Sequence, residues 1–309
     1  VQSVARTCCA ACCCRHGLRL RADLGSTIFV IFMMTSPHND DIGMSQSVNS
    51  ASFDAFDKGY INSGSVMVPC PWFYEMAQFC LKHPEIDYGI HLTLTGEWKN
   101  YPFRAISPTN QIQSLVNSHG YFYPKRAFIR DSAVLDEVYL ELKNQIEFAL
   151  SLGLKPTHLD SHMYTLGVRQ DLINLYQDLG NEYNLPIVLS KKLITLIGES
   201  PASFKLPKKG CIESIYMGSY SEFKKKGLPH FYDQLIDNLD GGVSLILIHP
   251  AIKSSEMEEI TLDHPNFGAS WRTVDADYFT SEHCKKKLEE NSIELIDFKS
   301  PKLLSFLDA

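Results

Sequence analysis

Short apolar segments alternate along this chain with amphipathic helical patterns, and this alternation restricts the folds open to it. Apolar, partly β-branched segments that predict strands occupy residues 28–34, 63–68, 88–94, 156–162, 186–189, 243–248 and 293–298. Segments with apolar positions at helical spacing occupy residues 45–59, 72–82, 135–152, 170–183, 230–238 and 281–290. Strands that alternate with helices predict a parallel sheet with right-handed crossovers. Because the composition shows no break, we expect one closed or nearly closed β/α barrel rather than two domains.

The composition is that of a folded globular protein. Hydrophobic residues make up 44% of the 309 residues and charged residues 21%, which excludes a disordered chain and a small disulfide-stapled scaffold. With 29 basic and 36 acidic residues the net charge is -7, so we expect binding to neither nucleic acid nor an anionic membrane. The longest apolar run, residues 28–34, is far shorter than the roughly 20 residues that span a bilayer.

The cysteines are distributed unevenly. Five of the nine are Cys8, Cys9, Cys12, Cys13 and Cys14. Cys9 and Cys12 have the CxxC spacing of metal and redox sites, but no second pair follows at finger-like spacing. We therefore expect residues 1–26 to be a poorly ordered Cys-rich extension and residues 27–309 to form the barrel domain. The other cysteines are scattered like isolated thiols in a reducing compartment, which predicts a cytoplasmic protein.

Polar clusters follow directly on four of the predicted strands. They are residues 38–41 (HNDD), His91, residues 158–162 (HLDSH) and His249. Because the catalytic groups of a β/α barrel come from the carboxyl ends of its strands, we expect these clusters to converge on one face. A single histidine in a strand is more often a hydrogen-bonded core residue, but four such strand ends favour a catalytic or metal site. His158 and His162 leave a strand rather than share a helix face, so both need not be ligands.

The adjacent carboxylates Asp40 and Asp41 can have different tasks. One can ligate a metal while the other takes a proton from water; the alternative is an Asx turn or a cap on the next helix. Histidine and aspartate ligands suit a divalent cation of the zinc type. Asp160 could orient an imidazole, and His249 could donate a proton to a leaving amine.

Four short motifs together resemble a known family. They are residues 39–45 (NDDIGMS), 89–95 (GIHLTLT), 156–162 (PTHLDSH) and 248–251 (IHPA). Their order and spacing look like the signature blocks of the YdjC-like carbohydrate deacetylases, which include the chitooligosaccharide deacetylases. The resemblance runs from about His38 to the last residue.

The resemblance implies a single deformed (β/α) barrel of the glycoside hydrolase/deacetylase type, an α/β fold. It also implies a metal-dependent hydrolase that removes the acetyl group of an N-acetylated sugar by breaking an amide bond. By motif, Asp40 resembles the general base, and Asp41, His91 and His162 resemble the metal ligands. His249 occupies the His-Pro position, to which we assign the acid role.

The resemblance leaves the cation and the assembly open. Family members are usually described with Mg²⁺, whereas two imidazoles and one carboxylate would prefer Zn²⁺ or another transition metal. His158 and Asp160 are expected to support the ligands from behind. An N-acetylated sugar is the expected partner, and the sequence is compatible with a homo-oligomer.

Two residues depart from the family pattern at the first strand. Pro37 restricts the backbone just before the motif, and Asn39 replaces a small residue. A displaced first strand would leave a catalytically impaired sugar-binding relative, and another metal-dependent hydrolase on the same barrel is the second alternative.

Late in the chain, Trp271, Arg272 and Asp275 predict either substrate contacts or a surface pair.

Overall fold

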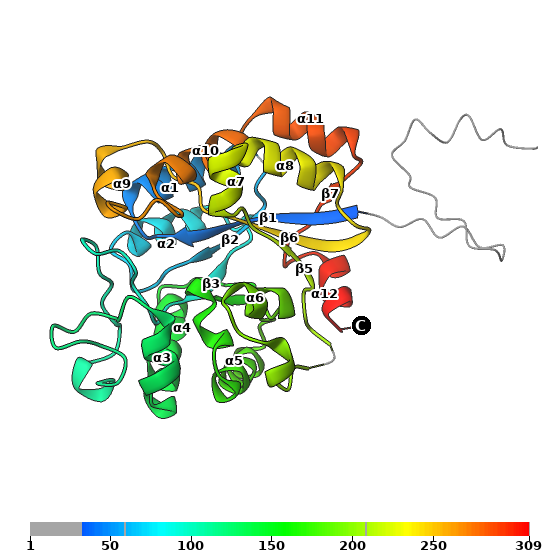
Figure 1. Ribbon diagram of the computed structural model, residues 1–309. Helices are drawn as coiled ribbons and strands as arrows, with labels where there is room; N and C mark the ends of the chain where they lie inside the picture. The colour runs from blue at the N-terminus through cyan, green and yellow to red at the C-terminus, as the bar shows by residue number, and fades with distance from the viewer. Residues whose placement is uncertain (1–32, 59, 208, 309) are drawn as a thin grey trace, which may run out of the picture.

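The computed structural model describes residues 33–58, 60–207 and 209–308, and its centre is a parallel sheet (Figure 1). The strands are β1 (Met33–Ile42), β2 (Ser63–Val66), β3 (Gly89–Leu92), β4 (Leu159–Ser161), β5 (Ser214–Tyr216), β6 (Gly242–Ile248) and β7 (Glu294–Leu295). Their order is β4-β3-β2-β1-β6-β5, and β7 pairs with the first part of β1. Every pairing between these strands is parallel, as the alternation of strands and helices predicts.

The two edges of the sheet approach each other through a fragmentary strand. Leu159 of β4 forms a parallel bridge with Ile187, and Leu189 forms another with Cys211, just before β5. The predicted strand at residues 186–189 is therefore present as isolated bridges rather than as a full ladder. The result is a curled parallel sheet with surrounding helices, which confirms the prediction of a deformed α/β barrel.

Helices cover the outside of the sheet in two groups (Figure 1). They are α1 (Gln46–Lys58), α2 (Phe73–Lys82), α3 (Arg126–Ser132), α4 (Leu135–Ser151), α5 (Gln170–Tyr183), α6 (Lys191–Leu196), α7 (Tyr220–Lys225), α8 (Leu228–Asp237), α9 (Ser255–Ile260), α10 (Ala269–Phe279), α11 (Glu282–Glu290) and α12 (Pro301–Asp308). Their apolar faces and the strands form three buried hydrophobic clusters. None of the helices in the described ranges has the length and apolar composition that a membrane span requires.

The first strand differs from its prediction. We expected a strand at residues 28–34 with the polar cluster 38–41 after it, but β1 runs from Met33 to Ile42 and contains that cluster; residues 28–32 lie outside the described part of the chain. Pro37 lies within the ladder opposite Ile246, so β1 continues through it. Its polar side chains are buried because they have partners inside the barrel. The predicted extension at residues 1–26 also lies outside the described residues.

Candidate active site

The four predicted polar clusters meet at one cavity of about 480 Å³. Its lining includes Asp40 and Asp41 from β1, His91 from β3, His162 just after β4 and His249 just after β6. Since these strands are parallel, their carboxyl ends lie on the same side of the sheet, which brings together residues up to 209 positions apart in sequence. Asp160 also lines the cavity, whereas His158 is buried beside it.

Asp41, His91 and His162 are buried, and the atoms with which they could bind a metal ion lie close together. Oδ1 of Asp41 lies 3.2 Å from Nδ1 of His162 and 3.6 Å from Nε2 of His91. One donor atom from each of the three residues lies within 4.8 Å of the others. Two imidazoles and a carboxylate in this arrangement are a donor set for a divalent cation.

In each of the two histidines, the ring nitrogen that points away from Asp41 forms a hydrogen bond with a carboxylate. Nδ1 of His91 contacts Oδ1 of Asp160 at 2.7 Å, and Nε2 of His162 contacts Oε2 of Glu97 at 2.9 Å. Each carboxylate accepts an N–H, so in the neutral imidazole, which is the form that binds a metal ion, the opposite ring nitrogen carries the lone pair that faces Asp41. Oδ1 of Asp41 is buried and accepts no hydrogen bond from the described residues. The residues therefore fit a cation, because their free lone pairs converge while carboxylates orient both imidazoles.

The backbone turns sharply where Asp41 enters the site. The register between β1 and β2 shifts between Asn39 and Ile42, and Asp41 has a φ of 65°, in the left-handed region. Nη2 of Arg272 donates to Oδ2 of Asp41 at 2.6 Å. Burial opposes ionisation of Asp41, but the charges of Arg272 and His162 outweigh it and hold the pKa of Asp41 well below its usual range.

Asp40 lies beside this group and faces two further histidines. Its Oδ1 is 3.4 Å from Nε2 of His38, and its Oδ2 is 3.7 Å from Nε2 of His249. Burial raises the pKa of Asp40 to about 7, although the charges of His91 and His38 act in the opposite direction. Burial, only partly offset by Asp41, lowers the pKa of His249 to about 3, so its ring is neutral near pH 7.

The late cluster on α10 is buried, so the interpretation of a surface pair was wrong. Asp275 accepts hydrogen bonds from the Tyr232 hydroxyl at 2.6 Å, the His249 backbone N–H at 2.9 Å and Nε1 of Trp271 at 3.2 Å. Arg272 also donates to the Phe267 carbonyl at 2.8 Å. Through these hydrogen bonds Asp275 holds the backbone of His249, and Arg272 holds the side chain of Asp41.

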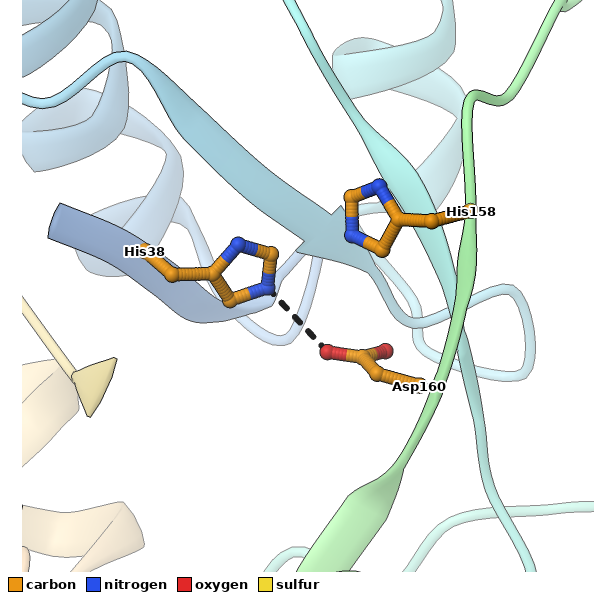
Figure 2. Close-up of side chains that lie close together, drawn as sticks. All are labelled: His38, His158 and Asp160. Carbon is orange, nitrogen blue, oxygen red and sulfur yellow. Dashed lines mark hydrogen bonds and ion pairs between the residues drawn. The ribbon is translucent and has the colours of Figure 1, made fainter. Parts of the chain in front are cut away.

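Asp160 and His158 were both predicted to support the ligands, but they contact different residues (Figure 2). Asp160 contacts His91 and, at 3.1 Å, Nε2 of His38. His158 contacts Oγ1 of Thr157 and stacks on Phe298 with ring centroids 3.8 Å apart. Of these two residues, Asp160 is thus the one in contact with a candidate ligand.

Glu97 and Arg272 are the residues whose contacts at this site the sequence did not predict. Glu97 follows the predicted third strand by only three residues, so its place after a strand end was a usable signal. From the sequence, Arg272 was linked only to substrate contacts or a surface pair, and its place in a helix gave no signal for the contact with Asp41. The rest of the cavity includes an apolar wall, formed by Leu193, Leu196, Ile197, Met217, Tyr220 and Phe267.

Comparisons with known proteins place the chain in a family. The sequence model of the YdjC-like proteins matches residues 38–290. A carbohydrate deacetylase of Thermoanaerobacter pseudethanolicus is 27% identical over 84% of this chain and 95% of its own length. A carbohydrate deacetylase of Thermus thermophilus is 30% identical over 80% of this chain and 85% of its own length.

A solved structure supports the fold. A candidate cellobiose-phosphate cleavage protein from Enterococcus faecalis superimposes with a TM-score of 0.70 at 23% identity. The superposition covers 87% of this chain and 98% of that protein. The superposition supports the fold, and the sequence match over residues 38–290 shows that the chain belongs to the YdjC-like protein family.

Proposed function

We propose that this protein is a metal-dependent carbohydrate deacetylase. It hydrolyses the acetamido group of an N-acetylated sugar or chitooligosaccharide to a free amine and acetate. The observation that carries the proposal is the convergence of the free donor atoms of Asp41, His91 and His162 next to a separate carboxylate, Asp40. The relatives named carbohydrate deacetylases support the same reaction.

Asp41, His91 and His162 would hold the cation. A bound divalent cation would supply positive charge that polarises the acetyl carbonyl and lowers the pKa of water. Arg272 occupies Oδ2 of Asp41, so that carboxylate offers Oδ1 alone. Two imidazoles favour zinc or another transition metal, whereas magnesium prefers oxygen ligands.

Asp40 is the proposed general base. It takes a proton from the attacking water while the water oxygen forms the new bond to the acetyl carbon. The bond between carbon and nitrogen then breaks, and the nitrogen takes up a proton to leave as the amine. Because His249 is neutral before the reaction, it gains this proton from Asp40, whose Oδ2 lies 3.7 Å from its Nε2, and passes it to the nitrogen.

The alternative of a catalytically impaired sugar-binding protein rested on displacement of the first strand. The ladder of β1 continues through Pro37, and Nδ2 of Asn39 donates to Oγ of Ser52 at 2.8 Å. Asp40 and Asp41 both line the cavity. These observations favour a working site.

The test is acetate release from diacetylchitobiose by protein that has been stripped of metal and resupplied with zinc, magnesium, manganese or cobalt. We expect release to depend on the added cation, and the same assay ranks the cations. Asp41→Ala, tested in parallel, should show no restoration. Tight cation binding without acetate release from any N-acetylated sugar would contradict the proposal.

A further inference from the structure

A second group of ionisable side chains lies beside the candidate site, and two of its members, His38 and His158, have no part in the proposed reaction. One ring nitrogen of His38, one of His158 and a carboxylate oxygen of Asp160 lie within 4.8 Å of one another (Figure 2). His38 and His158 are fully buried, and Asp160 is 5% exposed. The hydrogen bonds around the two rings show which ring nitrogens of His38 and His158 carry a hydrogen.

The Nδ1 atom of His38 carries a hydrogen. Oγ of Ser63 lies 2.6 Å from Oδ2 of Asp87 and 3.0 Å from Nδ1 of His38. A serine hydroxyl has one hydrogen, and the short bond to the Asp87 carboxylate uses it. Toward His38, Ser63 can therefore only accept, so Nδ1 is the donor.

The Nε2 atom of His38 also carries a hydrogen. It lies 3.1 Å from Oδ2 of Asp160 and 3.4 Å from Oδ1 of Asp40. A lone pair in that position would face the ionised carboxylate of Asp160 inside the barrel, whereas an N–H is attracted by it. Burial alone would lower the pKa of His38, but the hydrogen bond to Asp160 and the neighbouring negative charges raise it.

His158 fits a positive charge on His38. Oγ1 of Thr157 donates to the Tyr88 carbonyl at 3.1 Å, so it accepts from Nδ1 of His158 at 2.9 Å. This leaves Nε2 of His158 as a bare lone pair with no hydrogen-bond partner among the described residues. Its ring lies 5.1 Å from that of His38, and Figure 2 shows a ring nitrogen on the side that faces His38. A positive neighbour stabilises that lone pair.

A proton suits this cluster better than a second metal ion. His38 and Asp160 are in direct hydrogen-bond contact. A Cβ atom built on Gly89 would lie 2.5 Å from Nε2 of His158, so the β3 backbone packs closely against that nitrogen. Neither histidine lines the cavity.

We propose that His38 is a positioning residue, held as an imidazolium, that fixes Asp160 and through it the candidate ligand His91. Oδ2 of Asp160 accepts from His38 and, at 2.7 Å, from Oγ of Ser65. Oδ1 of Asp160 is then directed to Nδ1 of His91 at 2.7 Å. The role toward His91 rests on the proposed metal site, whereas the charge on His38 rests on the hydrogen bonds alone.

The charge is tested on the unchanged protein, free of metal and then loaded with Zn²⁺. Protein with ¹⁵N-labelled histidine is examined by two-bond ¹H–¹⁵N spectroscopy at neutral pH. We expect the His38 ring to show two protonated nitrogens and the His158 ring to show one. A single protonated nitrogen on His38, or a metal content of two zinc ions per chain, would overturn the proposal.

The positioning role is tested with two neutral variants. In His38→Gln the amide nitrogen can replace Nε2 as the donor to Asp160, whereas in His38→Asn it replaces Nδ1 and reaches Ser63 instead. We expect His38→Asn to weaken Zn²⁺ binding about 10- to 100-fold and His38→Gln to weaken it less. Exposed His83→Gln is the control for general effects.

Equal binding by both variants and the unchanged protein, or weaker binding by His38→Gln than by His38→Asn, would show that His38 does not position the site. Circular dichroism checks that both variants fold; if they do not, the spectroscopic test decides alone. Neither measurement uses a sugar. A failure to release acetate would therefore count against the proposed function and leave this inference standing.

Discussion

Nη2 of Arg272 donates to Oδ2 of Asp41 at 2.6 Å, and both side chains are buried. Nε of the same guanidinium donates to the Phe267 carbonyl, and its plane lies near the ring of Trp98. These contacts hold the guanidinium in one orientation. Asp41 consequently turns Oδ1, and not Oδ2, toward His91 and His162.

Replacement of Arg272 should therefore weaken cation binding. Arg272→Lys keeps the charge but cannot donate to Asp41 and Phe267 from one planar group, so we expect Zn²⁺ affinity to fall about 10- to 100-fold. Arg272→Met leaves Asp41 buried without its partner and should cost about 3–5 kcal/mol of stability. Zinc titration and urea unfolding measure the two effects. Unchanged zinc affinity in Arg272→Lys would show that the orientation of Asp41 does not depend on this contact.

Asp40 and Asp41 should respond differently to loss of charge, although they are adjacent. Asp40→Asn removes the proposed base and should lower kcat about 10²- to 10⁴-fold while zinc binding is retained. Asp41→Asn removes a candidate ligand and should abolish zinc binding as well as turnover. Acetate release and zinc titration on the same preparations separate these effects. If Asp40→Asn kept full activity, another group would be the base.

Removal of the metal should destabilise the fold in a way that depends on Asp41. The site holds Asp40, Asp41 and Asp160 close together inside the barrel, and a cation reduces their mutual repulsion. Zinc at one hundred times its Kd should stabilise the protein by about 2.7 kcal/mol, seen as a higher Tm. Addition of a chelator should reverse the shift. Asp41→Asn should show no shift with zinc, and an equal shift in that variant would place the cation elsewhere.

The sequence was sufficient to predict that the strand-end residues of the candidate site meet at one cavity, because a parallel barrel brings the carboxyl ends of its strands together. Asp40, His91 and His249 each follow or end a strand, and all of them line one cavity. The motif order that resembles the YdjC-like family predicted the same set. The deformed barrel was predictable for the same reason.

The extent of β1 and the role of Arg272 were not predictable in this way. Residues 35–41 are polar, and local preference favours a turn there; they form a strand because partners distant in sequence, such as Ser52 and Asp160, bond to their side chains. Arg272 lies 231 positions from Asp41 on a helix, where a charged side chain is usually exposed. Both features depend on tertiary contacts that no local pattern records.

Glu97 should contribute to metal binding through His162 alone. Its Oε2 accepts from Nε2 of His162 at 2.9 Å, which directs Nδ1 toward Asp41. Glu97→Ala should weaken Zn²⁺ binding about 10- to 100-fold, whereas Glu97→Gln keeps an accepting oxygen and should lose less. Zinc titration compares the two variants. Equal losses would indicate that the charge of Glu97 matters more than its hydrogen bond.

Two tyrosine hydroxyls donate to aspartates at different depths, and one of these aspartates also holds the backbone of His249. The Tyr232 hydroxyl donates to buried Asp275 at 2.6 Å, and the Tyr278 hydroxyl donates to Asp233 at 2.8 Å near the surface. Tyr232→Phe leaves a buried carboxylate short of a donor and should cost about 1–3 kcal/mol. Tyr278→Phe should cost less, because water can replace the lost donor.

Urea unfolding compares the two variants, and acetate release tests the link to the site. Since Asp275 also accepts the backbone N–H of His249, Tyr232→Phe should lower kcat and leave zinc affinity unchanged. Tyr278→Phe should change neither. Equal losses of stability and of kcat in both variants would contradict this prediction. They would show that the burial of Asp275 does not make the Tyr232 hydrogen bond more important than that of Tyr278, and that the cluster on α10 does not position His249.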